Sequence, residues 1–115
     1  MKSGIQFNQG EILIVPFPFS DLKGIKQRPV LVLSKTEYNN NCKDIITCGL
    51  TSNLKDSEYS ILIDDKDLIE GKLPITSRIK VDKLFTLEKT TIRKKIARIN
   101  RETMNKVKKE FFNLI

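Results

Sequence analysis

The chain lacks histidine and tryptophan altogether and has only 2 cysteines among its 115 residues. Histidine is the side chain most often used as a metal ligand or as an acid–base group near neutral pH, so any catalysis must use other groups. The spacing of Cys42 and Cys48 matches neither a redox motif nor a set of zinc ligands. Cys48 lies in an apolar run, which predicts a small core residue.

Long apolar runs are also missing. No run approaches the roughly 20 residues that a membrane-spanning helix needs, and residues 1–7 lack the apolar stretch of a signal peptide. We therefore expect a cytoplasmic protein that does not enter a membrane. The chain contains no repeat and no linker rich in proline, glycine or serine, so we expect a single domain spanning residues 1–115.

Positive charge is concentrated at the C-terminal end. The net charge is +7. Residues 1–88 hold 12 basic and 12 acidic groups, whereas residues 89–115 hold nine basic groups and two acidic ones. A basic segment of this kind favours a nucleic acid or an acidic protein partner. A solvated helix face explains the same charges equally well, and both interpretations stay open.

Short β-prone runs dominate the chain. We expect strands at 11–17, 30–33, 45–50, 59–64, 77–81, 84–87 and 95–99. Pro16 and Pro18 should bend the chain out of the sheet and start a loop, which places Arg28 just before the second strand. The polar pair Asp82-Lys83 predicts a bulge or a bend between the fifth and sixth strands. Residues 39–41 are typical of a turn, and residues 65–71 of one helical turn followed by a stop.

One helix is expected at the C-terminus. Asn100 is a favourable N-cap, and the apolar residues after it recur at helical spacing, which places one stripe on the core: Met104, Val107, Phe111 and Leu114. Tyr59, Phe85 and the Phe111-Phe112 pair should lie in the core or at a dimer contact. The predicted fold class is mainly β with a C-terminal helix, built as a small antiparallel barrel of SH3-like type.

Four segments, in order and spacing, resemble the MazF/PemK (Kid) family of bacterial toxin endoribonucleases. They are residues 10–12 with 27–32, residues 50–52, residues 77–89, and the Met104/Val107 step of the expected helix. The resemblance implies an enzyme of a type II toxin–antitoxin system that cleaves single-stranded RNA at selected sequences, with no metal or cofactor. A ribose 2′-hydroxyl would attack the adjacent phosphorus and leave a 2′,3′-cyclic phosphate and a 5′-hydroxyl. The family works as a homodimer, and its cognate antitoxin (MazE/PemI-like) inhibits it with an extended acidic segment.

The resemblance also implies roles for individual residues. Arg28 would contact the scissile phosphate, because its planar fork gives two parallel hydrogen bonds to an anion. Thr51 matches the catalytic threonine of the family, and Ser52 is better suited to positioning. One alternative is that Arg28 pairs with a carboxylate at a strand end. The other is that both hydroxyls bond the local backbone of a turn.

Lys80-Val81-Asp82 departs from the family pattern. The Kid branch has Arg-x-Asp there, with the aspartate proposed as base and the arginine as acid. Lys80 can act as an acid but offers no fork, and Asp82 beside two lysines is a weak base. A surface ion pair explains both residues equally well. That branch also uses a loop histidine, which this sequence lacks.

The remaining site predictions concern RNA binding. Phe19 and Ser20 should border the site, where Phe19 can stack on a base, although it also suits a core aromatic. Further contacts are predicted for Ser52, Asn53, Ser77 and Arg78.

Two other functions stay open. CcdB-like toxins have a similar architecture but bind DNA gyrase instead of cutting RNA, and they have no need to position Arg28-Pro29 and Thr51. A non-catalytic SH3-like module that binds RNA or protein is compatible with the missing histidine and with Lys80.

Overall fold

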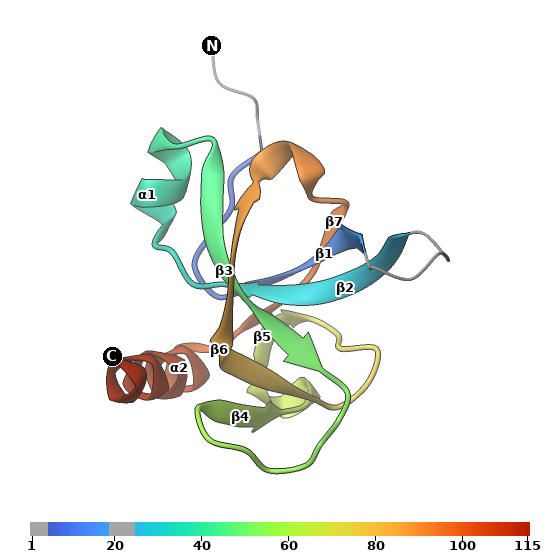
Figure 1. Ribbon diagram of the computed structural model, residues 1–115, viewed down its shortest axis with the longest axis vertical. Coiled ribbons are helices and arrows are strands. Elements are labelled where there is room, and N and C mark those ends of the chain that lie inside the picture. Colours follow the sequence, from blue (N-terminus) through green and yellow to red (C-terminus); the bar gives the residue numbers. More distant parts are fainter. Residues whose placement is uncertain (1–4, 19–24) are drawn as a thin grey trace.

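The computed structural model describes residues 5–18 and 25–115 (Figure 1). Seven strands form one antiparallel sheet, which curls into a half-barrel, with the order β4-β6-β3-β2-β1-β7-β5. The strands are β1 (Glu11–Pro18), β2 (Ile25–Val32), β3 (Asp44–Thr51), β4 (Ser60–Ile63), β5 (Leu68–Gly71), β6 (Ser77–Glu88) and β7 (Lys94–Ile99). The helices are α1 (Thr36–Asn41), α2 (Arg101–Leu114) and the short 3₁₀ turns η1 (Asp65–Asp67) and η2 (Lys89–Thr91). The predicted mainly-β class with a C-terminal helix is confirmed.

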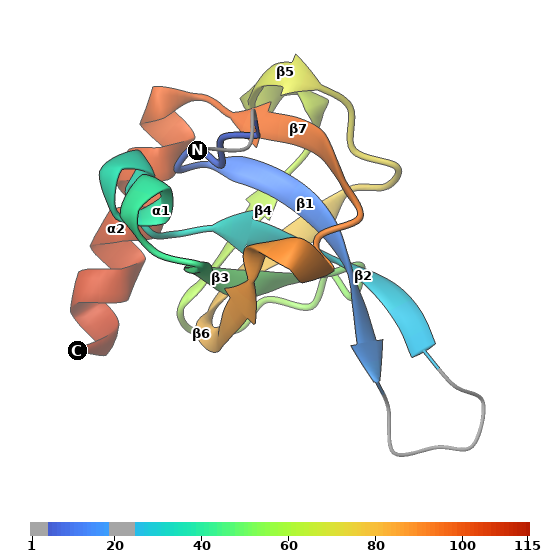
Figure 2. The same ribbon diagram turned by 90° about the horizontal axis from the view of Figure 1, so that it is seen from above.

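The β1–β2 hairpin is longer than the sequence suggests, and the predicted loop start at Pro16 is wrong. Pro16 pairs with Gln27, and the ladder continues to Pro18 opposite Ile25. On its other side, β1 pairs with β7 only from Glu11 to Ile14. The prolines therefore fall where one side of β1 has no ladder to interrupt, which is where a strand tolerates proline. Figure 2 shows the hairpin extending from the sheet on the side away from α2.

The extended hairpin also moves Arg28 from the predicted strand start to the middle of β2. Arg28 lies opposite Val15 of β1. Apolar residues next to each other on a strand, such as Ile12 and Leu13, enter two different core clusters on opposite faces of the sheet. This two-sided burial explains the near-continuous apolar run at the start of β1.

The predicted bulge in the fifth and sixth strands is confirmed, although the two are one long strand. The register of β3 against β6 shifts between Cys48 opposite Leu84 and Gly49 opposite Lys80. Cys48 is fully buried, as predicted. Burial raises the pKa of its thiol to about 12, and the nearby Asp82 charge adds to the shift.

The C-terminal helix follows its prediction closely. The Asn100 side chain accepts a hydrogen bond of 2.8 Å from the backbone N–H of Thr103, which satisfies one free donor at the helix start. Met104 and Val107 are buried in the larger core cluster, and Phe111 packs against it. Phe112, predicted in the core or at a dimer contact, is 69% exposed. Figure 1 places α2 beside β6 and β4, which it contacts.

One local prediction is wrong and another is confirmed only in part. Residues 39–41 end helix α1 instead of forming a turn, because the buried Asn39 side chain bonds Phe7 O at 2.8 Å and Ser34 O at 3.0 Å. Residues 65–71 contain a 3₁₀ turn followed by the edge strand β5. Among the described residues, no helix has the length and apolar character to cross a membrane.

Candidate active site

A cleft of about 670 Å³ opens where β2, β3 and β6 run side by side. Arg28 and Pro29 come from β2, and Gly49, Leu50 and Thr51 from β3. Lys80, Lys83 and Phe85 of β6 and four residues of the segment between β3 and β4 complete the lining: Asn53, Lys55, Asp56 and Ser57. The cleft therefore draws on three parts of the chain that are distant in sequence.

The sheet register brings Arg28, Thr51 and Lys80 to one face. Val30 pairs with Gly49, and Gly49 pairs with Lys80. Arg28 precedes Val30 by two residues and Thr51 follows Gly49 by two, so alternation of side chains places both on the face that carries Lys80.

Gly49 lines the cleft with its backbone alone. A Cβ atom on Gly49 would lie 3.5 Å from Phe85 Cε2, so the Phe85 ring covers the bare backbone of this residue. Phe85 was predicted in the core or at a dimer contact, but it is partly exposed and lines the cleft.

The segment between β3 and β4 begins with two consecutive side-chain turns. Thr51 Oγ1 accepts a hydrogen bond of 3.1 Å from the backbone N–H of Asn53, and Asn53 Oδ1 accepts one of 3.1 Å from Lys55 N–H. This is the local backbone bonding that the sequence left open for Thr51. A hydroxyl that accepts one bond still has its own proton to donate, so Thr51 can act in the turn and on a ligand together.

Arg78 of β6 holds the same segment through three contacts of its guanidinium. Its Nε donates to Leu54 O at 3.1 Å, its Nη1 donates to Ser60 Oγ at 3.0 Å, and its Nη2 lies 3.4 Å from Asp56 Oδ1. The Arg78 side chain is only 12% exposed. Its guanidinium thus fixes the protein's own backbone, and Arg78 is not among the residues that line the described part of the cleft.

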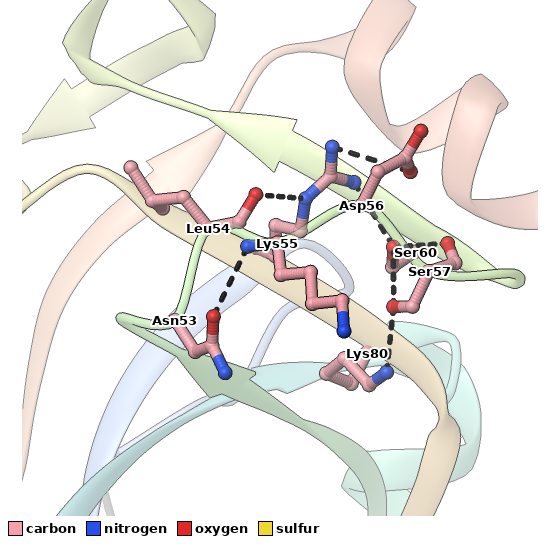
Figure 3. Close-up of polar contacts among 8 residues, drawn as sticks. Asn53, Leu54, Lys55, Asp56, Ser57, Ser60 and Lys80 are labelled. Carbon is pink, nitrogen blue, oxygen red and sulfur yellow. Dashed lines mark hydrogen bonds and ion pairs between the residues drawn. The ribbon is translucent and has the colours of Figure 1, made fainter.

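Lys80 is held by a chain of hydroxyl groups. Its Nζ donates to Ser57 Oγ at 2.8 Å, and Ser57 Oγ donates to Ser60 Oγ at 3.1 Å. Figure 3 shows the Lys80 ammonium directed towards Ser57. The surface ion pair with Asp82 that the sequence left open is not among the ion pairs of the described residues; Lys80 is instead fixed at the cleft wall.

The cleft is strongly cationic. Arg28, Lys55, Lys80 and Lys83 line it, and Asp56 is the one carboxylate among its described lining residues. Such a lining attracts an anionic ligand. None of these cations belongs to residues 89–115, all of which the structure describes. The C-terminal excess of positive charge therefore lies outside this cleft.

The structure gathers some of the predicted site residues and leaves others apart. Arg28, Thr51, Asn53 and Lys80 line the cleft. The exposed Ser52 and Asp82 do not line its described part, and the buried Ser77 donates its hydroxyl to Ile75 O at 2.9 Å. Phe19 and Ser20 lie outside the described residues.

Sequence reasoning missed the other polar and aromatic residues of the lining: Lys55, Asp56, Ser57, Lys83 and Phe85. The signal available for Lys55 and Ser57 was the polar stretch that follows the third strand. For Lys83 it was the predicted bulge, which aims a side chain out of the regular alternation.

Comparison with known proteins gives a family match and a set of similar folds. Residues 8–114 match the family described as the PemK-like, MazF-like toxin of type II toxin–antitoxin systems. The search of curated proteins found no match.

Solved structures share the fold at low identity. An endoribonuclease from a mycobacterial species is 19% identical, with a TM-score of 0.75 over 95% of this chain and 90% of that one. An endoribonuclease in complex with its cognate antitoxin, also mycobacterial, is 20% identical, with a TM-score of 0.74 over 92% and 91%. MazF from Deinococcus radiodurans is 20% identical, with a TM-score of 0.71 over 96% of each chain. The family match extends over nearly the whole chain, and the protein therefore belongs to the PemK-like, MazF-like toxins of type II toxin–antitoxin systems.

Proposed function

We propose that this protein is an endoribonuclease toxin that cleaves single-stranded RNA in the cytoplasm without a metal ion. The observation that carries the proposal is the cationic cleft in which the sheet register gathers Arg28, Thr51 and Lys80. RNA is the polyanion that also supplies its own nucleophile, the ribose 2′-hydroxyl. Similar folds include proteins described as endoribonucleases.

In the proposed reaction, the 2′-oxygen forms a bond to phosphorus while the bond to the 5′-oxygen breaks. The 2′-hydroxyl proton goes to a base, and the 5′-oxygen takes a proton from an acid, which leaves a cyclic phosphate and a 5′-hydroxyl. Arg28 would bind the phosphoryl oxygens, where charge builds up, with its two parallel donors. The Thr51 hydroxyl would donate to the same phosphate from the neighbouring strand.

Proton transfer is assigned to side chains other than histidine. Lys80 would protonate the leaving oxygen, since its ammonium lines the cleft and is held by Ser57 at 2.8 Å. We keep Asp82 as the proposed base, and Asp56 is the alternative because it is the carboxylate of the described cleft lining. Asp82→Asn and Asp56→Asn separate the two, because loss of a general base costs about 10²–10⁴-fold in rate.

We also propose that the toxin acts as a homodimer. An apolar groove of about 510 Å³ lies between α2 and the sheet and is lined by Leu33, Ile46, Leu84, Met104, Phe111 and Phe112, among others. The exposed Phe112 ring at this groove suits burial against a second copy, as the family's dimeric architecture implies. Phe112→Glu should then convert dimers to monomers in sedimentation analysis, whereas an unchanged mass would place the interface elsewhere.

The proposed inhibitor is a cognate antitoxin with an extended acidic segment. The described cleft lining has four cations and one carboxylate. This charge favours binding of an acidic segment in the cleft, where the RNA is proposed to bind. Antitoxin and RNA should therefore compete for the protein.

Cleavage of a long single-stranded RNA in excess EDTA tests the central proposal. Wild type should give discrete cuts ending in cyclic phosphate, and Arg28→Ala or Thr51→Ala should lower the rate by about 10²–10³-fold, as loss of one transition-state donor does. Arg101→Ala, which removes an equal charge at an exposed position of α2, is the control.

Each other outcome points to a different function. A folded wild type that leaves RNA intact rejects the nuclease proposal. Binding to DNA gyrase would then support the CcdB-like alternative, and RNA binding without cleavage would support a non-catalytic module.

A further inference from the structure

A second cationic hollow lies outside the cleft, at the start of β7. It has a volume of about 500 Å³, and its lining includes Gln6, Phe7, Asn8, Arg93, Lys94 and Lys95. Three of the nine cations of residues 89–115 therefore meet at one depression of the surface. No residue of this hollow has a role in the proposed reaction.

The hollow and the cleft are separated by a single strand. Arg28 lies opposite Val15 on the β2 side of β1, and the backbone N–H of Arg93 donates to Ile14 O at 2.9 Å on the β7 side. Neighbouring strands are about 4.8 Å apart, so the backbones of Arg28 and Arg93 are roughly 10 Å apart across β1. A single strand of nucleic acid that leaves the cleft at Arg28 would have to pass over β1 to reach Arg93.

The cations of the hollow have different roles. Lys95 serves the protein itself: its Nζ lies 3.3 Å from the carboxylate of the buried Glu11 and 5.2 Å from the centre of the Phe7 ring, and it also bonds Gln6 O. Arg93 and Lys94 are exposed, and within residues 5–18 and 25–115 neither forms an ion pair with a carboxylate. These two cations are available to an anionic ligand.

We propose that Arg93 and Lys94 form a second phosphate-binding site, which holds the backbone of single-stranded RNA beyond the cleft. The choice of RNA as ligand rests on the proposed function. Cations that contact phosphates position a nucleic acid without reading its bases. This site therefore raises affinity for any RNA long enough to extend from Arg28 across β1, and it leaves the choice of cleavage sequence to the cleft.

The salt dependence of binding measures such contacts directly. Each phosphate contact on a single strand adds about 0.7 to the slope of log K against log salt concentration, because bound counterions are released. Removal of two contacts should lower the magnitude of the slope by about 1.4, which corresponds to on the order of tenfold weaker binding near 0.1 M salt.

The experiment is a salt titration of binding to a 2′-O-methyl RNA of about 20 nucleotides, which exceeds a typical single-strand site and lacks the nucleophile. The test variant is Arg93→Gln with Lys94→Gln, and Lys95 stays intact because its loss would expose buried Glu11. The control is Lys106→Gln with Lys109→Gln, which removes the same charge from exposed positions of α2. Cleavage of unmodified RNA by wild type is measured in parallel.

A smaller slope for the test variant alone supports the second site. An unchanged slope overturns it, and so does an equal change in the α2 control, because either result means that only overall charge matters. If wild type cuts RNA while the slope is unchanged, the second site fails and the proposed function stands. If wild type does not cut RNA but the salt-dependence slope becomes smaller in the test variant alone, the second site stands and the nuclease proposal fails.

Discussion

Arg78 does not line the described part of the cleft, but replacing it should disturb the cleft. Replacing it by methionine keeps a long side chain on β6 but removes the donors that hold the segment between β3 and β4. Those donors bond Leu54 O at 3.1 Å and Ser60 Oγ at 3.0 Å. We expect the segment that carries Asn53, Lys55 and Ser57 into the cleft to open more often in the variant.

The magnitude follows from the two hydrogen bonds. A bond from a charged donor contributes about 1.5–3 kcal/mol when its partners are buried. Here Leu54 is exposed, and Ser60 Oγ keeps its bonds to Ser57, so water and neighbours replace part of the loss. The Asp56 ion pair adds under about 1 kcal/mol, because that carboxylate is 88% exposed. The sum is about 2 kcal/mol of local stability.

Hydrogen exchange of the Lys55 amide, which bonds Asn53 Oδ1 at 3.1 Å, measures this opening. A loss of about 2 kcal/mol makes exchange about 30-fold faster, while amides in β1 should change little because the core stays packed. Arg101→Met makes the same replacement at an exposed position of α2. Unchanged Lys55 exchange in Arg78→Met, or an equal acceleration in Arg101→Met, would refute the reasoning.

Three further predictions concern stability. Gly71→Ala should lower the free energy of unfolding, measured by chemical denaturation, by more than about 3 kcal/mol, because Gly71 has φ +77° and a Cβ there would lie 2.1 Å from Ile96 O. Gly49→Ala is the control: the nearest atom to its Cβ would lie 3.5 Å away, so the free energy of unfolding should be nearly unchanged. Asn100→Ala should cost about 1 kcal/mol through the lost cap, and an unchanged midpoint would mean that the cap is replaced. Burial raises the pKa of the Cys48 thiol from 9.0 to about 12. The stability that the protonated thiol contributes is therefore full below pH 9 and falls as the pH rises towards 12, by up to about 1.4 kcal/mol per pH unit. Cys48→Ala should lose this fall in stability at alkaline pH, and parallel pH profiles of stability for the two proteins would contradict the assignment.

The fold was largely predictable because hydrophobic period and capping are local properties. The α2 stripe and the Asn100 cap need only a few consecutive residues. The prediction for Pro16 failed because a proline destabilises a strand only where its missing N–H would have bonded a neighbouring strand. On one side of β1 the partner strand β7 stops pairing at Ile14, before Pro16. Asn39 was misjudged because its bonds to Phe7 and Ser34 come from tertiary structure.

The site was predictable only in part, for a related reason. The resemblance placed Arg28, Thr51 and Lys80 in one function, but their proximity depends on register across three strands, which the sequence does not state. Lys55 and Ser57 reach the cleft because Arg78 of β6 fixes the segment that carries them. Arg78 lies 18 residues after Ser60, to which it donates a hydrogen bond, so this contact is not visible in the local sequence. Arg78 itself resembled an RNA contact because an arginine that binds backbone carbonyls and one that binds phosphate look alike in sequence.

The distribution of charge connects these findings. The cleft takes its cations from the part of the chain whose charges balance, and the excess at 89–115 lies elsewhere, partly at the β7 hollow. An acidic antitoxin segment seated in the cleft would neutralise Arg28 and Lys80 but leave Arg93 and Lys94 exposed. Because phosphate contacts at separate places contribute separately to affinity, inhibited toxin should then keep a weak, salt-sensitive hold on RNA that it no longer cuts. An antitoxin that abolishes both binding and cleavage must cover β1 and reach the hollow as well.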